Sequence, residues 1–259
     1  ITEGLVGSEM CIRDRSKMDH LVAISEYVKK TIVKKYNLSP NKISVINRGI
    51  DTEYFNQSPD AETKDNIIKN YKIDTAKKII LFPARITSWK GQLEFIDVIK
   101  KIDTQNIFVL FAGDTKNESY TKLVRDKIKQ NNLEGVCKIL GSVNQDEMRS
   151  LYQVADLSVC FPLRAEGFGR TVSESLYSKT TVLAFDYGGV KNQLANLSEI
   201  FKVKPQDYQA LPAKIEQLLG LSEVEKKEAL EGVQSVIESN FSKINMVKQY
   251  LKLYESFKS

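Results

Sequence analysis

The sequence predicts an α/β protein in which helices cover both faces of a doubly wound parallel sheet. Six short apolar runs support this, because they are continuous rather than alternating in polarity, as in strands buried on both faces. Helical patterns separate the runs, for example Trp89–Ile102, which places Leu93, Ile96 and Ile99 on one face, and Tyr120–Gln130. The expected strands are residues 78–84, 107–113, 137–141, 157–162, 181–186 and 199–203.

The composition is that of a folded globular protein. Of the 259 residues, 42% are hydrophobic and 27% are charged, so disorder is not expected. The net charge of +5 is too small to indicate nucleic-acid binding. It fits an anionic ligand, an anionic membrane surface or an ordinary basic surface. No apolar run approaches the roughly 20 residues that span a bilayer, and we identify no signal peptide.

The cysteines and the histidine argue against disulfides and metal ligation. Cys11, Cys137 and Cys160 lack paired spacing, which favours a reducing cytosol. With His20 as the single histidine, and no cluster of metal-ligand type, we expect no metal site. We interpret His20 as structural.

We divide the chain into four segments. Residues 1–15 show no period and read as a non-native leader, similar to translated sequencing adapter. Residues 16–50 form a βαβ unit too small to bury its own faces, so we interpret it as the remnant of a larger N-terminal domain. Residues 51–240 form the main α/β domain. Residues 241–259 form a helix expected to pack back toward the N-terminal domain; a membrane-surface helix would show the same pattern.

The chemistry-bearing residues follow the expected strands, where ligands bind in open parallel sheets. After residues 78–84, Arg85 and Lys90 flank a helix start whose free amides favour a diphosphate, although two surface cations would look alike. After residues 157–162 come Glu166 and Glu174, which can hold two parts of an elongated polyol. Glycine-marked loops follow most of the strands and can approach a ligand closely. The remaining candidates are Gly113, Val143, Gly167, Phe168, Gly169, Gly188, Gly189 and Val190.

From Asp19 to its end, the chain resembles the retaining family-4 glycosyltransferases of the GT-B fold, in their C-terminal, donor-binding half. Glu166–Glu174 matches the family's E-x7-E signature in its E-G-F-G form, Arg85 and Lys90-Gly91 match a second motif, and Asn47–Phe55 resembles the interdomain segment, with Arg48 as a departure. The resemblance implies that Arg85 and Lys90 neutralise the donor diphosphate and that Glu174 binds the ribose. Glu166 and the backbone of 167–169 would hold the sugar, residues 188–190 would assist through backbone amides, and Val143 would meet the base.

The resemblance also implies partners and a location. The donor would be a nucleotide-diphosphate sugar, the acceptor a glycan or a lipid-linked molecule, and no cofactor, metal or nucleic acid would be needed. The chain would be cytoplasmic, with possible peripheral contact with the inner face of the membrane. Because the early acceptor-domain motifs are missing, we expect an N-terminally truncated fragment that binds donor without transferring sugar.

Three other functions remain open. In a nicotinamide-dependent dehydrogenase, Gly167 and Gly169 would start the dinucleotide motif, but Val172 stands where the third glycine belongs. A sugar-nucleotide epimerase would also bind a nucleotide sugar. A non-catalytic binding module would be indifferent to alanine at Glu166 and Glu174.

Overall fold

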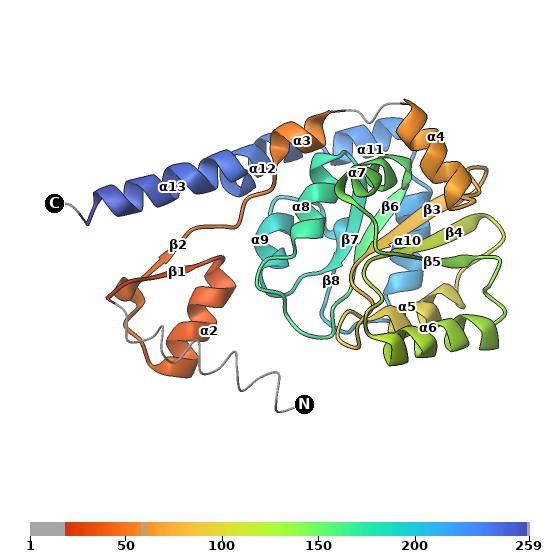
Figure 1. The fold of residues 1–259 in the computed structure, drawn as a ribbon, viewed down its shortest axis with the longest axis horizontal. Helices are drawn as coiled ribbons and strands as arrows, with labels where there is room; N and C mark the ends of the chain where they lie inside the picture. The colour runs from red at the N-terminus through yellow and green to blue at the C-terminus, as the bar shows by residue number, and fades with distance from the viewer. Residues whose placement is uncertain (1–18, 58–60, 258–259) are drawn as a thin grey trace.

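The structure is a computed structural model that describes residues 19–57 and 61–257. The expected leader, residues 1–15, and Cys11 lie outside the described residues. The main domain is an α/β unit with one parallel sheet (Figure 1), which confirms the predicted fold class. Its strands are β3 (Lys78–Pro83), β4 (Ile107–Ala112), β5 (Cys137–Gly141), β6 (Leu157–Cys160), β7 (Thr181–Phe185) and β8 (Lys202–Val203).

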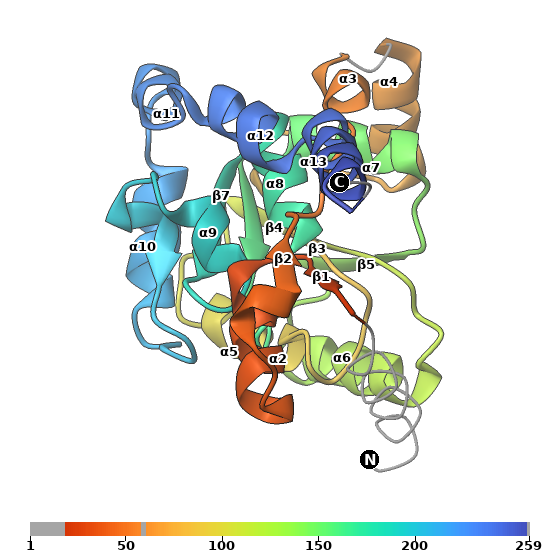
Figure 2. The same cartoon turned by 90° about the vertical axis from the view of Figure 1, so that its left-hand side faces the viewer.

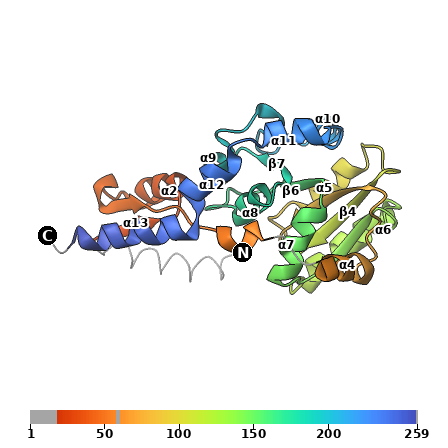
Figure 3. The ribbon, with the colours of Figure 1, turned by 90° about the horizontal axis from the view of Figure 1, so that it is seen from above.

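The strands lie in the order β5-β4-β3-β6-β7-β8, with all neighbours parallel. The chain therefore winds outward from β3 in one direction and from β6 in the other, as in a doubly wound fold. Helices cover both faces (Figure 3). They are α4 (Ala61–Asn70), α5 (Gln92–Ile99), α6 (Glu118–Gln130), α7 (Gln145–Val154), α8 (Arg170–Tyr177), α9 (Val190–Leu194), α10 (Leu211–Leu219) and α11 (Glu223–Ala229).

Aromatic side chains fill the core beneath the carboxyl ends of the central strands. The ring centroids of Phe82 and Phe95 lie 5.4 Å apart, and those of Phe161 and Phe185 lie 5.1 Å apart. All four side chains are buried, so the loops that follow β3 and β6 start from a rigid base. Cys160 is also a buried free thiol, and burial raises its pKa.

A small second unit precedes the main domain. It consists of β1 (Leu21–Ala23), α2 (Glu26–Tyr36) and β2 (Ile43–Val45), and β1 pairs with β2 in parallel. Figure 2 shows this unit beside the edge of the main domain where α8 and α9 lie. The His20 ring contacts Phe257, with centroids 5.1 Å apart, and its Nε2 lies 2.9 Å from Ser44 Oγ.

Two segments that connect the units are tied together. Ile50 N donates to Phe241 O at 2.8 Å, and Lys243 N donates to Ile50 O at 2.7 Å. Gly49 has to be small here, because a Cβ would lie 2.4 Å from Lys243 N. The chain then enters α3 (Thr52–Asn56), whose N-terminus Asp51 caps.

The helix expected at residues 241–259 corresponds to α13, which is a separate helix from α12 before it. Helix α12 (Val233–Phe241) ends before Ser242, whose side chain accepts from Asn245 N and starts α13 (Lys243–Glu255). The two helices are separate because Ser242 bridges to Ile50 in an extended conformation. None of the residues of α13 is buried, and four of its large apolar side chains are exposed: Ile244, Val247, Leu251 and Tyr254. Its packing against an N-terminal domain stays a prediction.

Some element bounds differ from the sequence prediction for local reasons. The helix expected from Trp89 starts at Gln92, because Gly91 has φ +88° and cannot continue a helix. The strand expected at 199–203 is reduced to Lys202–Val203, because Glu199–Phe201 form a 3-10 turn. These differences leave the strand order unchanged.

Candidate functional site

The candidate site lies at the centre of the sheet, where β3 and β6 are neighbours. After β3 the chain continues toward β4, and after β6 it continues toward β7 on the opposite side of the sheet. The loops that follow β3 and β6 therefore diverge and leave a crevice between them. Crevices of this kind, at the carboxyl ends of parallel strands, are where open α/β sheets bind ligands. Lys90 comes from the loop after β3, and Glu166 comes from the loop after β6.

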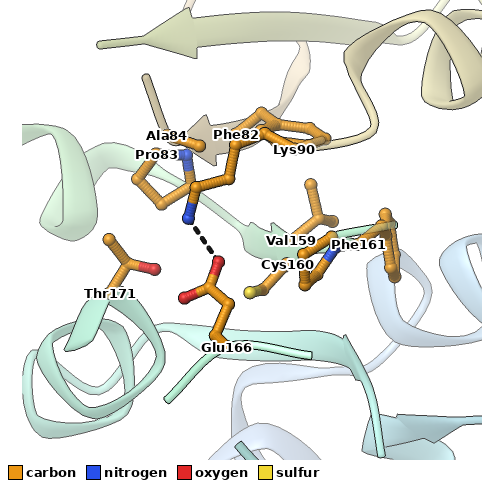
Figure 4. A pocket seen from close by; sticks show the side chains of 10 residues that line it. Phe82, Pro83, Ala84, Lys90, Val159, Cys160, Phe161, Glu166 and Thr171 are labelled. Carbon is orange, nitrogen blue, oxygen red and sulfur yellow. Dashed lines mark hydrogen bonds and ion pairs between the residues drawn. The ribbon is translucent and has the colours of Figure 1, made fainter. Parts of the chain in front are cut away.

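Lys90 Nζ and Glu166 Oε1 form an ion pair across this crevice (Figure 4). The side chains are only 16% and 12% exposed. Lys90 Nζ also lies 4.3 Å from the centroid of the Trp89 ring, a favourable position for a cation. The pair borders a recess of about 10 Å³, lined by Ala84, Cys160 and Thr171 among others. A space of that size holds roughly one water molecule, so the ion pair occupies the crevice.

Two helices begin at the crevice without a side-chain cap. Helix α5 starts after Gly91 with φ +88°, and α8 starts after Gly169 with φ +80°. In the described part of the chain, neither helix has an N-cap side chain that accepts a hydrogen bond from its first-turn amides. Uncapped amides and the positive end of the helix dipole favour an anion.

The glycine loops after β6 and β7 pack against each other. Gly189 N donates to Glu166 O at 2.8 Å, and a Cβ on Gly189 would lie 2.2 Å from Gly167 O. A Cβ on Gly188 would lie 2.6 Å from Glu166 O. These glycines thus allow close loop packing that holds Glu166 in place. A phosphate cradle at residues 188–189 stays a prediction.

Glu174 is buried on α8 and its carboxylate is already engaged. Arg170 Nε lies 2.8 Å from Oε1, and the Tyr152 hydroxyl donates to Oε2 at 2.9 Å. Desolvation raises the pKa of Glu174, against the opposing effect of Arg170, Tyr152 and the more distant Arg48. A ribose at this carboxylate would have to replace one of these partners.

The other expected site residues lie at the same edge of the sheet in different environments. The Arg85 side chain is exposed and has no hydrogen-bond or ion-pair partner within residues 19–57 and 61–257. Phe168 and Val190 are buried, and Phe168 packs on Phe241, so these two can offer a ligand only their backbone. Val143 is half-buried before α7, and Gly113 packs against Ala84 O.

The small N-terminal unit contributes contacts that the sequence analysis did not identify. Ser25 Oγ donates to Gly167 O at 2.6 Å, and the rings of Tyr27 and Tyr187 lie 6.5 Å apart. A Cβ on Gly167 would lie 3.2 Å from Ile24 Cδ1. The helix-capping serine before Glu26 was the only available signal, and it does not reveal a contact 142 residues away.

The doubly wound sheet, with its charged crevice at the switch point, has the α/β architecture of GT-B glycosyltransferases. The family models agree. Residues 63–231 match the model described as "Glycosyl transferases group 1", and residues 9–54 match "Glycosyltransferase Family 4". The chain belongs to the group 1 glycosyltransferase family.

Related proteins extend this result. The α-maltose-1-phosphate synthase of Mycobacterium tuberculosis is 26% identical over 179 residues, which cover 68% of this chain and 46% of that protein. A glycosyltransferase structure from Rickettsia africae superposes with a TM-score of 0.86 at 28% identity, covering 95% of this chain and 66% of that one. Anabaena HepE in complex with UDP and glucose gives a TM-score of 0.83 at 18% identity, covering 96% and 66%. The chain spans about half the length of the curated relatives it matches.

Two features are absent from the part of the chain that the structure describes. Within residues 19–57 and 61–257, each helix is too short or too polar to span a bilayer. In the same residues, no group of three or more His, Cys, Asp or Glu side chains could hold a metal ion.

Proposed function

We propose that this chain is the donor-binding part of a retaining, family-4 glycosyltransferase. The whole enzyme would transfer a sugar from a nucleotide-diphosphate sugar to a glycan or lipid-linked acceptor on the cytoplasmic side, without a metal or other cofactor. This 259-residue chain alone would bind the donor and not transfer the sugar. The observation that carries the proposal is the Lys90–Glu166 pair, placed at the switch point between two uncapped helix starts.

The proposed roles follow from charge and position. Lys90, Arg85 and the first-turn amides of α5 and α8 would bind the diphosphate and stabilise the negative charge that develops as it leaves. Glu166 would accept hydrogen bonds from sugar hydroxyls beside the reacting carbon, and Glu174 would accept from the ribose. The protein would accelerate the reaction by positioning and by electrostatic stabilisation rather than through a covalent intermediate.

Similar proteins support the choice of ligand. Anabaena HepE has been solved in complex with UDP and glucose and in complex with UDP-glucose. Because HepE is 18% identical to this chain, the similarity establishes the fold, and a uridine nucleotide here is part of the proposal.

Calorimetric titration with UDP and GDP tests the binding, and Arg85→Gln tests the site. The Arg85 side chain is exposed and has no partner among the described residues, so we expect its loss to leave the stability unchanged. The variant should bind the preferred nucleotide roughly tenfold more weakly, because a charge-assisted hydrogen bond contributes about 1.5 kcal/mol or more.

The matched control is Arg125→Gln, which removes an exposed arginine from α6, outside the proposed site. Equal losses in the two variants would mean that only overall charge matters and would reject the site. Turnover of UDP-glucose or GDP-mannose to a glycosylated acceptor by this chain would overturn the expected lack of transfer.

A further inference from the structure

Lys90 and Glu166 are proposed to bind different parts of the donor, yet in this structure they bind each other. Lys90 is the only cation among the described residues that line the recess, and Glu166 is the only carboxylate. Both side chains are largely withdrawn from solvent. Each group therefore satisfies the charge of the other when no ligand is bound.

Because of this ion pair, the binding free energy of a ligand depends on whether the ligand provides new partners for one or for both of the two charged groups. A diphosphate that takes Lys90 leaves the Glu166 carboxylate without its partner in a partly desolvated position, and an unpaired buried charge is costly. The Glu166 backbone is fixed, because its carbonyl accepts from Gly189 N at 2.8 Å, so the side chain can move away only through its own rotamers.

A complete nucleotide sugar differs from the nucleoside diphosphate in this respect. Its sugar hydroxyls are hydrogen-bond donors next to the diphosphate, and a carboxylate accepts such bonds through two oxygens. The sugar can thus satisfy Glu166 at the moment when the diphosphate takes Lys90. Lys90 then exchanges Glu166 for phosphate, and Glu166 exchanges Lys90 for sugar hydroxyls.

We propose that exchange of the Lys90–Glu166 ion pair makes this site discriminate between an intact nucleotide sugar and the nucleoside diphosphate that remains after transfer. The inference rests on the proposed donor-binding function. Glu166 is in this role a specificity-determining residue: it weakens the binding of the product and has little net effect on the binding of the donor. Product release is favoured as a result.

Calorimetric titration of the full chain with UDP, UDP-glucose, GDP and GDP-mannose tests the exchange. We expect Glu166→Gln to bind the nucleoside diphosphate about tenfold more tightly than the wild-type chain, because Lys90 is then free of a charged competitor. Its affinity for the matching nucleotide sugar should change by much less. The dissociation constant of the nucleoside diphosphate, divided by that of the nucleotide sugar, should therefore fall by roughly the same factor.

Two further variants keep the test interpretable. Glu166→Asp retains the negative charge but withdraws the carboxylate by one methylene, so the ratio should fall in the same direction even if Glu166→Gln does not fold. Asp97→Asn breaks the ion pair between Asp97 of α5 and Lys127 of α6, which does not border the recess. This variant should leave the ratio unchanged.

The outcomes separate this inference from the proposed function. If the wild-type chain binds nucleotides and both ligands gain equally in Glu166→Gln, the effect is general electrostatics and the exchange is wrong. An unchanged ratio in both Glu166 variants overturns it as well. If the wild-type chain binds none of the four ligands, the proposed function and the exchange both fail.

Discussion

The helices that start at the centre of the sheet differ from α6 and α7, which start on the side of β4 and β5. At the side, α6 and α7 begin with Asn117 and Asn144, and each side chain accepts from a first-turn amide. At the centre, α5 and α8 begin with Gly91 and Gly169, which leave these amides without a side-chain partner. All four helices follow strands of one sheet, so the difference lies in the residue type at the N-cap.

This difference separates stability from function along one edge of the sheet. A side-chain cap stabilises a helix by about 1 kcal/mol, and it occupies the amides that an anion would otherwise use. The central helices forgo that stabilisation next to Lys90, where an anionic ligand is proposed to bind. The lateral helices α6 and α7 keep their caps, which indicates that their N-termini serve the fold.

The largest effect is expected from Gly91→Ala. Alanine at φ +88° is strained, and its Cβ would lie 2.2 Å from Phe161 O, an atom of the backbone that follows β6. We expect a loss of about 3 kcal/mol, from left-handed strain and overpacking together. Urea unfolding measures the loss, and the displaced backbone should also weaken nucleotide binding.

Gly232→Ala is the matched control, because Gly232 also precedes a helix, α12, with φ +73°. No atom lies within 4 Å of its would-be Cβ, so only the strain of roughly 1 kcal/mol should remain. Equal losses for the two variants would show that conformation alone requires glycine at the centre, and would remove the argument from close packing.

A smaller effect, confined to stability, is expected from Asn144→Ala at the start of α7. Asn144 Oδ1 accepts from Glu147 N at 2.9 Å, and Glu147 Oε2 accepts from Asn144 N at 2.7 Å, which forms a capping box. We expect a loss of about 1 kcal/mol in urea unfolding and unchanged affinity for UDP and GDP. A marked loss of affinity would place the lateral helices in the site and break the comparison.

The sequence predicted the sheet because buried parallel strands have a continuous apolar pattern that needs no tertiary information. The same pattern could not place the ends of elements that depend on distant partners. Ser242 ends α12 because it meets Ile50, far away in the chain, and Gly91 ends the loop before α5 because Phe161 lies against it. Both contacts form only after the fold has assembled.

The location of the site could be predicted from the sequence, but the contacts between its side chains could not. The carboxyl ends of parallel strands meet at one edge, so Lys90 and Glu166 were expected near each other. Their ion pair depends on the positions of two side chains that are 76 residues apart in the sequence. The hydrogen bond between Ser25 and Gly167 depends on the position of the small N-terminal unit. The roles of these residues in binding stay predictions.

The smallest expected effect concerns Glu174, which gives the central helix α8 a buried charge. Its pKa is raised from 4.5 by desolvation, so the folded chain binds this proton more tightly than the unfolded chain. Stability contributed by the protonated form is therefore lost as the pH rises from about 4.5 through the raised value. Urea unfolding at several pH values should show a shallower decline over this range in Glu174→Gln than in the wild-type chain.

Glu228→Gln is the matched control for this last measurement, because it removes an exposed carboxylate from α11. A decline in Glu174→Gln as steep as in the wild-type chain would show that Arg170 and Tyr152 fully compensate the burial of the carboxylate. In that case Glu174 would be a structural ion pair of α8, equivalent in its role to the caps of the lateral helices, and the contrast between centre and side would rest on the glycines alone.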